Sequence, residues 1–312
     1  MHKSRHFRAF WLCKCGVALV LVVCLIAFVA HFASTHSEEV NLATLDFESM
    51  DAIEQQAWQL AEEIVGASRD AQERFVAKLL NTYYSVRNSD FAIFCNPGGW
   101  GKKPLSVNYQ GQSCLAGIEA ELTELGYRYC MIDDVRTGSG LWNYLFEFKE
   151  YLTHYPLKAK ELAAEIDFLT RQVTDLKVII TGQSNGAAFT SEVAKYLESN
   201  PNIYSIQLGC PFWYQAPEVG QSLVIDDSGI GVDTLAKGDL MTLLKVNCVK
   251  LFAIGYAPSF TPIDWMITRA VLVFGSYDFN LGLKAPGHEY IWEYPGVGPV
   301  IEAFLVDNFG IE

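Results

Sequence analysis

Short apolar segments alternate with amphipathic ones from residue 90 to the end of the chain, and this alternation constrains the fold more than any other feature. Strands are predicted at 90–95, 127–133, 177–181, 203–209 and 221–225. Helices are predicted over 113–126, within 142–174, over 185–199 and over 298–310. Continuous apolar strands separated by helices predict an α/β fold, with a mostly parallel sheet covered by helices on both faces.

The N-terminal region predicts a membrane segment followed by a helical hairpin. Residues 15–37 carry no formal charge and follow a basic stretch, so they are long enough to span a bilayer with the main domain outside the cytoplasm. A cleavable signal peptide, which would make the protein secreted, is the alternative. No small-x-small cleavage site follows the apolar run, which favours an uncleaved anchor over 1–37. Residues 38–88 predict a helical hairpin that packs on or leads to the main domain, 89–312.

The charge balance argues against one class of partner. Beyond residue 36 the chain has 19 basic and 36 acidic residues, which gives this part a net charge of −17. Nucleic-acid binding needs a basic face, so we expect no nucleic-acid partner.

Five cysteines lie in the main domain: Cys95, Cys114, Cys130, Cys210 and Cys248. No Cys-x-x-Cys motif occurs, so a zinc site is not predicted. One or two disulfides would fit an extracytoplasmic domain. Three of the five lie in or beside apolar strand-like runs, which favours the interpretation that they are small buried hydrophobic residues.

The pentapeptide Gly-Gln-Ser-Asn-Gly at 182–186 lies between a predicted strand and a predicted helix. A serine hydroxyl becomes a useful nucleophile when a sharp strand-to-helix turn holds it clear of its neighbours and beside a base. Such a turn brings residues two positions to either side into contact, and glycine at both positions removes the collision. The N-terminus of the following helix offers free amides for a developing oxyanion. Ser184 is therefore the candidate nucleophile.

On this motif the chain resembles the α/β-hydrolase superfamily, over roughly residues 88–310. The stretch Phe-Cys-Asn-Pro-Gly-Gly-Trp-Gly at 94–101 follows an upstream strand, where esterases and lipases of the superfamily keep a glycine-rich oxyanion loop. The resemblance implies that the oxyanion hole uses the backbone amide of Asn185 and that of one of Gly98, Gly99 and Trp100. It also implies an acyl-enzyme mechanism that needs no cofactor and no metal.

The candidate base follows from elimination. Four of the six histidines lie in or beside the N-terminal segment: His2, His6, His31 and His36. His154 precedes Ser184, whereas His288 follows it by 104 residues and comes just before the last helix. The superfamily's chain order is nucleophile, acid, histidine, which His288 satisfies and His154 does not.

The acid is less constrained, because six aspartates lie between Ser184 and His288: Asp226, Asp227, Asp233, Asp239, Asp264 and Asp278. Lipase-like members place the acid in a loop after the strand beyond the nucleophile, and Asp233 fits that position. Asp278 lies only ten residues before His288, too few for an intervening helix and strand. Asp233 is the predicted acid, with Asp227, Asp239 and Asp278 as alternatives.

Together these features predict a serine hydrolase that acts on an ester or related acyl bond, in the manner of a carboxylesterase or lipase. The expected substrate is a small-molecule or lipid acyl compound, and the membrane is an expected partner through the N-terminal segment. The alternative is a non-catalytic α/β-hydrolase-like module that binds a ligand or partner at the membrane.

Overall fold

The computed structural model describes residues 52–138, 141–214, 221–253 and 284–310. The chain divides into two compact units: Met1–Ser49 with Ala67–Arg69, and Met50–Gly66 with Asp70–Glu312. All of the described strands belong to the second unit. The predicted anchor and two of the aspartate candidates, Asp264 and Asp278, lie outside the described residues. Among the helices that are described, none has the length and apolar character needed to cross a membrane.

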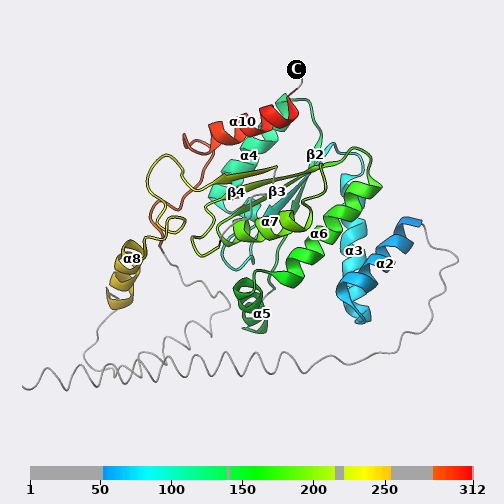
Figure 1. Ribbon diagram of the computed structural model, residues 1–312, viewed down its shortest axis with the longest axis horizontal. Helices are drawn as coiled ribbons and strands as arrows, with labels where there is room; N and C mark the ends of the chain where they lie inside the picture. Colours follow the sequence, from blue (N-terminus) through cyan, green and yellow to red (C-terminus); the bar gives the residue numbers. More distant parts are fainter. Residues whose placement is uncertain (1–51, 139–140, 215–220, 254–283, 311–312) are drawn as a thin grey trace, which may run out of the picture. The chain divides into compact units, whose positions relative to one another are not determined.

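Five parallel strands form the sheet, in the order β2-β1-β3-β4-β5 (Figure 1). The strands are β1 Phe91–Asn96, β2 Tyr129–Asp133, β3 Lys177–Gln183, β4 Ile203–Leu208 and β5 Ser222–Ile225. Every residue of β1 and β4 is buried, as is all of β3 beyond its first residue, which explains their continuous apolar runs. The predicted α/β class and parallel sheet are confirmed.

The described helices are α2 Ala52–Val65, α3 Arg69–Val86, α4 Tyr109–Glu124, α5 Leu141–Leu152, α6 Pro156–Gln172, α7 Asn185–Tyr196, α8 Leu240–Ala253 and α10 Gly298–Phe309, with a 3-10 turn at Leu105–Val107. Local chemistry sets several of their ends. The Asn108 side chain accepts a hydrogen bond from the Gln110 N–H and so caps α4. Pro156 opens α6, where a missing N–H costs nothing.

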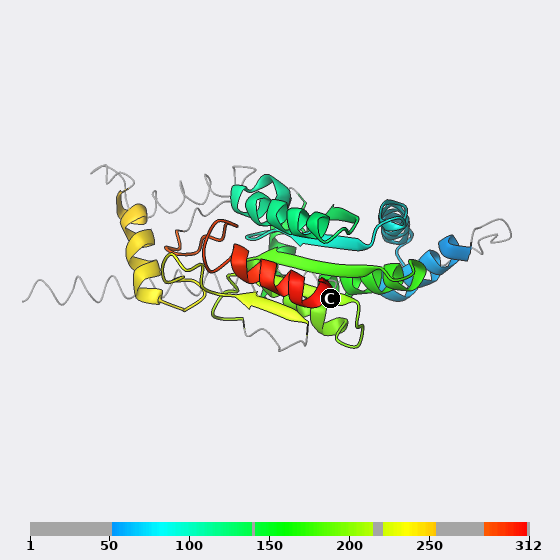
Figure 2. The same ribbon diagram turned by 90° about the horizontal axis from the view of Figure 1, so that it is seen from above.

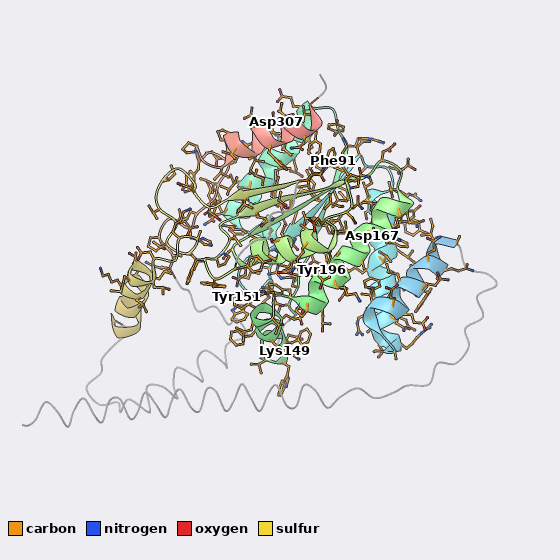
Figure 3. All side chains as sticks on the ribbon, viewed as in Figure 1. Phe91, Lys149, Tyr151, Asp167, Tyr196 and Asp307 are labelled. Carbon is orange, nitrogen blue, oxygen red and sulfur yellow. The ribbon has the colours of Figure 1, made fainter. Side chains whose placement is uncertain are left out.

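Helices cover both faces of the sheet, because side chains alternate along each strand (Figure 2). On β1, Ala92 and Phe94 join the apolar cluster formed with α2, α3, α6 and α7. Ile93 and Cys95 point to the opposite face and join the cluster formed with α4 and α10. The labelled Phe91 ring belongs to this second cluster, with its centroid 4.7 Å from that of Phe309 (Figure 3).

Helices α2 and α3 lie within the segment predicted as a hairpin. Ala57, Phe75 and Leu79 are buried in the same cluster as α6. An ion pair adds to this packing, since Lys78 Nζ of α3 lies 2.9 Å from a carboxylate oxygen of Glu165, which is fully buried on α6. Both helices therefore contribute buried side chains to the same apolar cluster as α6.

The strand order places two loops side by side. The chain leaves β1 towards β2 on one side of the sheet, and leaves β3 towards β4 on the other. In open parallel sheets of this order, ligands bind at the carboxyl ends of the strands, where the direction of winding reverses. The loop beginning at Pro97 follows β1 and Ser184 follows β3, so both lie at this switch point.

The four cysteines with described side chains are free: Cys95, Cys114, Cys130 and Cys210. Two of the three expected to be buried hydrophobic residues, Cys95 and Cys210, are indeed buried, whereas Cys130 is partly exposed. Burial raises the pKa of the Cys114 and Cys210 thiols to about 12. These thiols are therefore protonated at neutral pH and unsuited to act as nucleophiles.

Candidate active site

Ser184 lies in a strained turn between β3 and α7. Its backbone has φ 56° and ψ −123°, a conformation that costs a non-glycine residue of order 1–3 kcal/mol. Three hydrogen bonds hold it there: the Ser184 N–H donates to the Leu208 carbonyl at 2.8 Å, and the Ser184 carbonyl accepts from the N–H groups of Ala187 and Ala188 at 2.8 and 3.2 Å. The pentapeptide thus forms the strand-turn-helix that the sequence predicts around Ser184.

The two glycines of the motif are required by close backbone packing. A Cβ on Gly182 would overlap the carbonyl of Gly186 and lie 2.6 Å from Thr190 Oγ1. A Cβ on Gly186 would overlap the Asn96 carbonyl and lie 2.7 Å from the Pro97 carbonyl oxygen. Gly186 therefore lets α7 begin directly against the end of β1.

Ser184 and His288 line the same cavity, of about 560 Å³. Its other lining residues are Pro97, Gly98, Gly99, Trp100, Lys102, Lys103, Pro104, Leu105, Val107, Asn108, Gln110 and Gln183. The lining formed by the described residues contains no carboxylate, although the chain as a whole is acidic. This cavity brings together the predicted nucleophile, the predicted base and the glycine-rich loop.

His288 pairs with Asp233. The His288 Nδ1 lies 2.8 Å from Asp233 Oδ2, and Asp233 is fully buried behind the imidazole. The opposite ring nitrogen, Nε2, is buried and forms no hydrogen bond within the described part of the chain, so Ser184 and His288 are not hydrogen-bonded to each other. Without a bound substrate, catalytic hydrogen bonds are often unformed.

Four donors surround the Asp233 carboxylate. Oδ2 accepts from His288 and from the Tyr290 hydroxyl at 2.5 Å, while Oδ1 accepts from the N–H groups of Leu235 and Ala236 at 2.8 and 2.9 Å. Burial raises the pKa of Asp233, but these hydrogen bonds outweigh burial and lower the pKa to about 2. Asp233 is therefore a carboxylate at neutral pH, able to stabilise a protonated imidazole.

The alternative acids have other partners. Asp227 accepts from the Gly229 N–H at 2.8 Å, which closes a turn. Asp239 accepts from the Thr242 N–H at 3.0 Å and caps α8. His154 also lies apart, with its ring packed edge to face against Tyr214. Among the described aspartates, Asp233 alone is hydrogen-bonded to His288.

Two segments with candidate backbone amides border the Ser184 turn. Asn185 is the first residue of α7, and its N–H has no acceptor within the described residues. Its side chain donates to the Gly99 carbonyl at 3.2 Å and so links the turn to the glycine-rich loop. Gly99 and Trp100 line the cavity, and a Cβ on Gly98 would lie 3.4 Å from Ser184 Cβ. The three loop residues predicted as oxyanion candidates thus surround the cavity beside Ser184.

Three features of the site were not predicted from the sequence. Gly209 follows β4 with φ 60°, and a Cβ there would lie 2.8 Å from His288 Cε1, so this glycine makes room for the imidazole. A glycine directly after a strand is a signal that could have found it. Tyr290 lies two residues after His288 and has no distinguishing pattern. Gln110 accepts hydrogen bonds from Gln183 and from the Tyr290 N–H, which no motif predicts.

The acidic pair Asp133–Asp134 and the aromatic pair Phe212–Trp213 have surroundings of their own. No group of three or more His, Cys, Asp or Glu side chains within the described ranges could hold a metal ion. Asp133 accepts a hydrogen bond from the Ser106 hydroxyl, and Asp134 pairs with Lys78. The aromatic residues Phe212 and Trp213 are partly exposed and do not line the cavity.

By sequence, no family model and no curated protein matches the chain. One similar solved structure is that of Trichoderma reesei cutinase in complex with a C11Y4 phosphonate inhibitor. The identity is 13 %, the TM-score is 0.38, and the match covers 69 % of this chain and 86 % of the cutinase chain.

Proposed function

We propose that this protein is a serine hydrolase of α/β-hydrolase type that cleaves an ester or related acyl bond. The observation that carries the proposal is the strained conformation of Ser184 at the C-terminal end of β3. Ser184 lines the same cavity as His288, whose imidazole is paired with Asp233. Strain of this kind persists where the surrounding structure imposes it, and it is concentrated at functional sites.

In the proposed reaction, Ser184 Oγ attacks the acyl carbon while His288 Nε2 accepts the hydroxyl proton. The Nε2 atom supports this role, because Nδ1 is engaged by Asp233 while Nε2 has no hydrogen-bond partner among the described residues and can act as a base. The ionised Asp233 holds the ring orientation and stabilises the imidazolium.

The tetrahedral intermediate carries its negative charge on the former carbonyl oxygen. We assign the Asn185 N–H as one donor to this oxygen, because it opens α7 and the positive end of the helix dipole lies there. A second amide comes from the glycine-rich loop, where Gly98, Gly99 and Trp100 are the predicted candidates. Collapse of the intermediate releases the alcohol with the proton from His288, and water then hydrolyses the acyl-enzyme by the same steps.

The substrate that we propose is a small-molecule or lipid acyl compound. If the N-terminal segment 1–37 is retained, the hydrolase is anchored to a membrane with its catalytic domain outside the cytoplasm; if it is cleaved, the protein is secreted. Extraction of membranes at alkaline pH distinguishes the two, because an anchored protein stays in the pellet.

Labelling with a fluorophosphonate probe tests the function. We expect the wild-type protein to be labelled on Ser184 and the Ser184→Ala variant to take no label. Ser191, a buried serine on α7, provides a matched control, and Ser191→Ala should label as the wild type does. Failure of the wild type to react, while it is folded by circular dichroism, would favour the non-catalytic binding module.

A further inference from the structure

Arg136 is a cation buried beneath the glycine-rich loop. Its side chain is 1 % exposed, and its Nη2 donates a hydrogen bond to the Pro97 carbonyl at 2.8 Å. Its Nε lies 3.3 Å from Glu147 on α5, which is equally buried. Lys158 on α6 completes the cluster, with Nζ 2.5 Å from the other Glu147 oxygen and 2.5 Å from the Arg136 carbonyl.

The loop rests on this guanidinium at both of its ends. Besides the bond to Pro97, Gly101 packs on the charged group so closely that a Cβ would lie 2.9 Å from Arg136 Cζ. The Thr137 N–H donates to the Gly101 carbonyl at 3.2 Å. Arg136 also lies over the Phe189 ring of α7, at 4.8 Å from the centroid. The guanidinium thus joins the loop to the helix that begins beside Ser184.

The contact with Pro97 determines which way a neighbouring N–H points. In a planar trans peptide the carbonyl and the next N–H point in opposite directions, and no cis peptide occurs in the described chain. Because the Pro97 oxygen is bound by Arg136, the Gly98 N–H points away from the guanidinium. Gly98 lines the cavity beside Ser184, and its N–H has no acceptor among the described residues.

We propose that Arg136 is a positioning residue, which holds the Pro97–Gly98 peptide so that the Gly98 N–H serves as the second oxyanion donor beside the Asn185 N–H. This inference rests on the hydrolase function proposed above. A reversed peptide would turn the Pro97 carbonyl towards the developing negative charge and remove the donor. A hydrogen bond from a charged group biases such an equilibrium by roughly ten- to hundredfold.

Stability alone does not account for the arrangement. A buried ion pair is often no more stable than apolar residues of the same volume. Arg136 Nη1 is buried without a hydrogen-bond partner in the described residues, which adds a further cost. A positioning role explains why a cation, with its fork of donors, lies under this loop.

The test compares rates of fluorophosphonate labelling and ester hydrolysis in three variants. For Arg136→Met we expect labelling and kcat to fall roughly ten- to hundredfold, with KM within about threefold of the wild-type value, because the lost interaction forms only with the oxyanion. Arg136→Lys keeps a charged donor and should recover part of the rate. Glu147→Gln is the control, because it removes the ion pair and leaves the Arg136–Pro97 hydrogen bond in place.

Wild-type labelling rates in folded Arg136→Met would overturn the positioning role and leave the hydrolase function intact. An equal rate loss in Glu147→Gln would also overturn it, by attributing the effect to the ion-pair cluster as a whole. If Arg136→Met does not fold, Arg136→Lys decides: we expect it to label roughly three- to tenfold more slowly, and an unchanged rate refutes the proposal. Absence of labelling in the wild type would overturn the function itself, and this inference with it.

Discussion

The Ser184 side and the His288 side of the cavity are held in different ways. Ser184 is presented by five consecutive residues, 182–186, whose glycines let β3, α7 and the end of β1 pack backbone against backbone. His288 is oriented by Asp233, which is 55 residues away in the chain and reaches it through a buried hydrogen bond. The first side depends on backbone shape and the second on buried polar groups.

One residue connects the two sides. Gln110, on α4, accepts a hydrogen bond from Gln183 next to Ser184 and another from the Tyr290 N–H near His288. We therefore expect substitutions near Ser184 to change the protein through steric overlap, and substitutions near His288 to change it through charge and protonation.

The largest expected effect is on the His288 side. Asp233→Asn places an amide NH₂ or a neutral oxygen against His288 Nδ1. The imidazole tautomer that carries its proton on Nδ1 is then less favoured, and the charge that stabilises the imidazolium is lost. We expect kcat/KM for an ester to fall by roughly 10³–10⁴. Asp227→Asn and Asp239→Asn are the controls, and both should keep near wild-type rates. Comparable losses in either control would contradict the pairing.

The Ser184 side should respond through shape. In Gly186→Ala, the new methyl group overlaps the Asn96 carbonyl, so the free energy of unfolding should fall by roughly 3 kcal/mol. Gly231→Ala is a matched control, since no atom lies within 4 Å of its added Cβ. Denaturant titration of both variants measures the difference, and equal stabilities would show that the close packing at Gly186 is not limiting.

Acid should act on the His288 side. The pKa of Asp233 is lowered from 3.8 to about 2 in the folded protein, so the carboxylate stabilises the fold above pH 4. This contribution, about 2 kcal/mol, should be lost as pH falls from roughly 5 to 2. The measurement is the free energy of unfolding of the wild type minus that of Asp233→Asn, followed against pH. A difference that does not change over this range would refute the assigned pKa.

The smallest effect is expected for Tyr290→Phe. It removes one of the four donors to Asp233 and leaves the bond to His288 in place, so the free energy of unfolding should fall by about 1.5 kcal/mol. The pKa of Asp233 should rise towards its ordinary value, so the range of pH over which acid lowers the free energy of unfolding should become narrower. We expect kcat/KM to change by less than about tenfold. A loss as large as that of Asp233→Asn would instead assign Tyr290 a role equal to that of the acid.

Much of the fold was predictable because its signals are local. Each of the five predicted strands is present within one to two residues of its expected bounds, since a buried parallel strand needs a continuous apolar run. The predicted helices at 185–199 and 298–310 are present as α7 and α10. The pattern of the apolar run 248–256 fits a helix or a strand equally well, and the part of it that the structure describes, 248–253, is helical.

The candidate site was predictable only in part. Ser184 and its glycines form one continuous motif, and His288 followed from the few histidines in the main domain. The choice of Asp233 among six aspartates relied on position alone, because a turn aspartate and a hydrogen-bonded acid look alike in sequence. Gly209 and Tyr290 were missed, since their importance comes from contact with His288 rather than from a pattern.

By itself, the sequence of this protein determined the α/β class, the turn that presents Ser184 and the short list of its partners, because hydrophobic periodicity and glycine sterics act between neighbouring residues. The tertiary structure alone decided the strand order that sets the Pro97 loop beside Ser184, and the pairing of Asp233 with His288. It also decided the contact of Arg136 with the Pro97 carbonyl. These three contacts depend on which groups, distant in the sequence, are buried together. In a buried environment an unpaired charge is costly, and each polar atom needs a hydrogen-bond partner from another part of the fold.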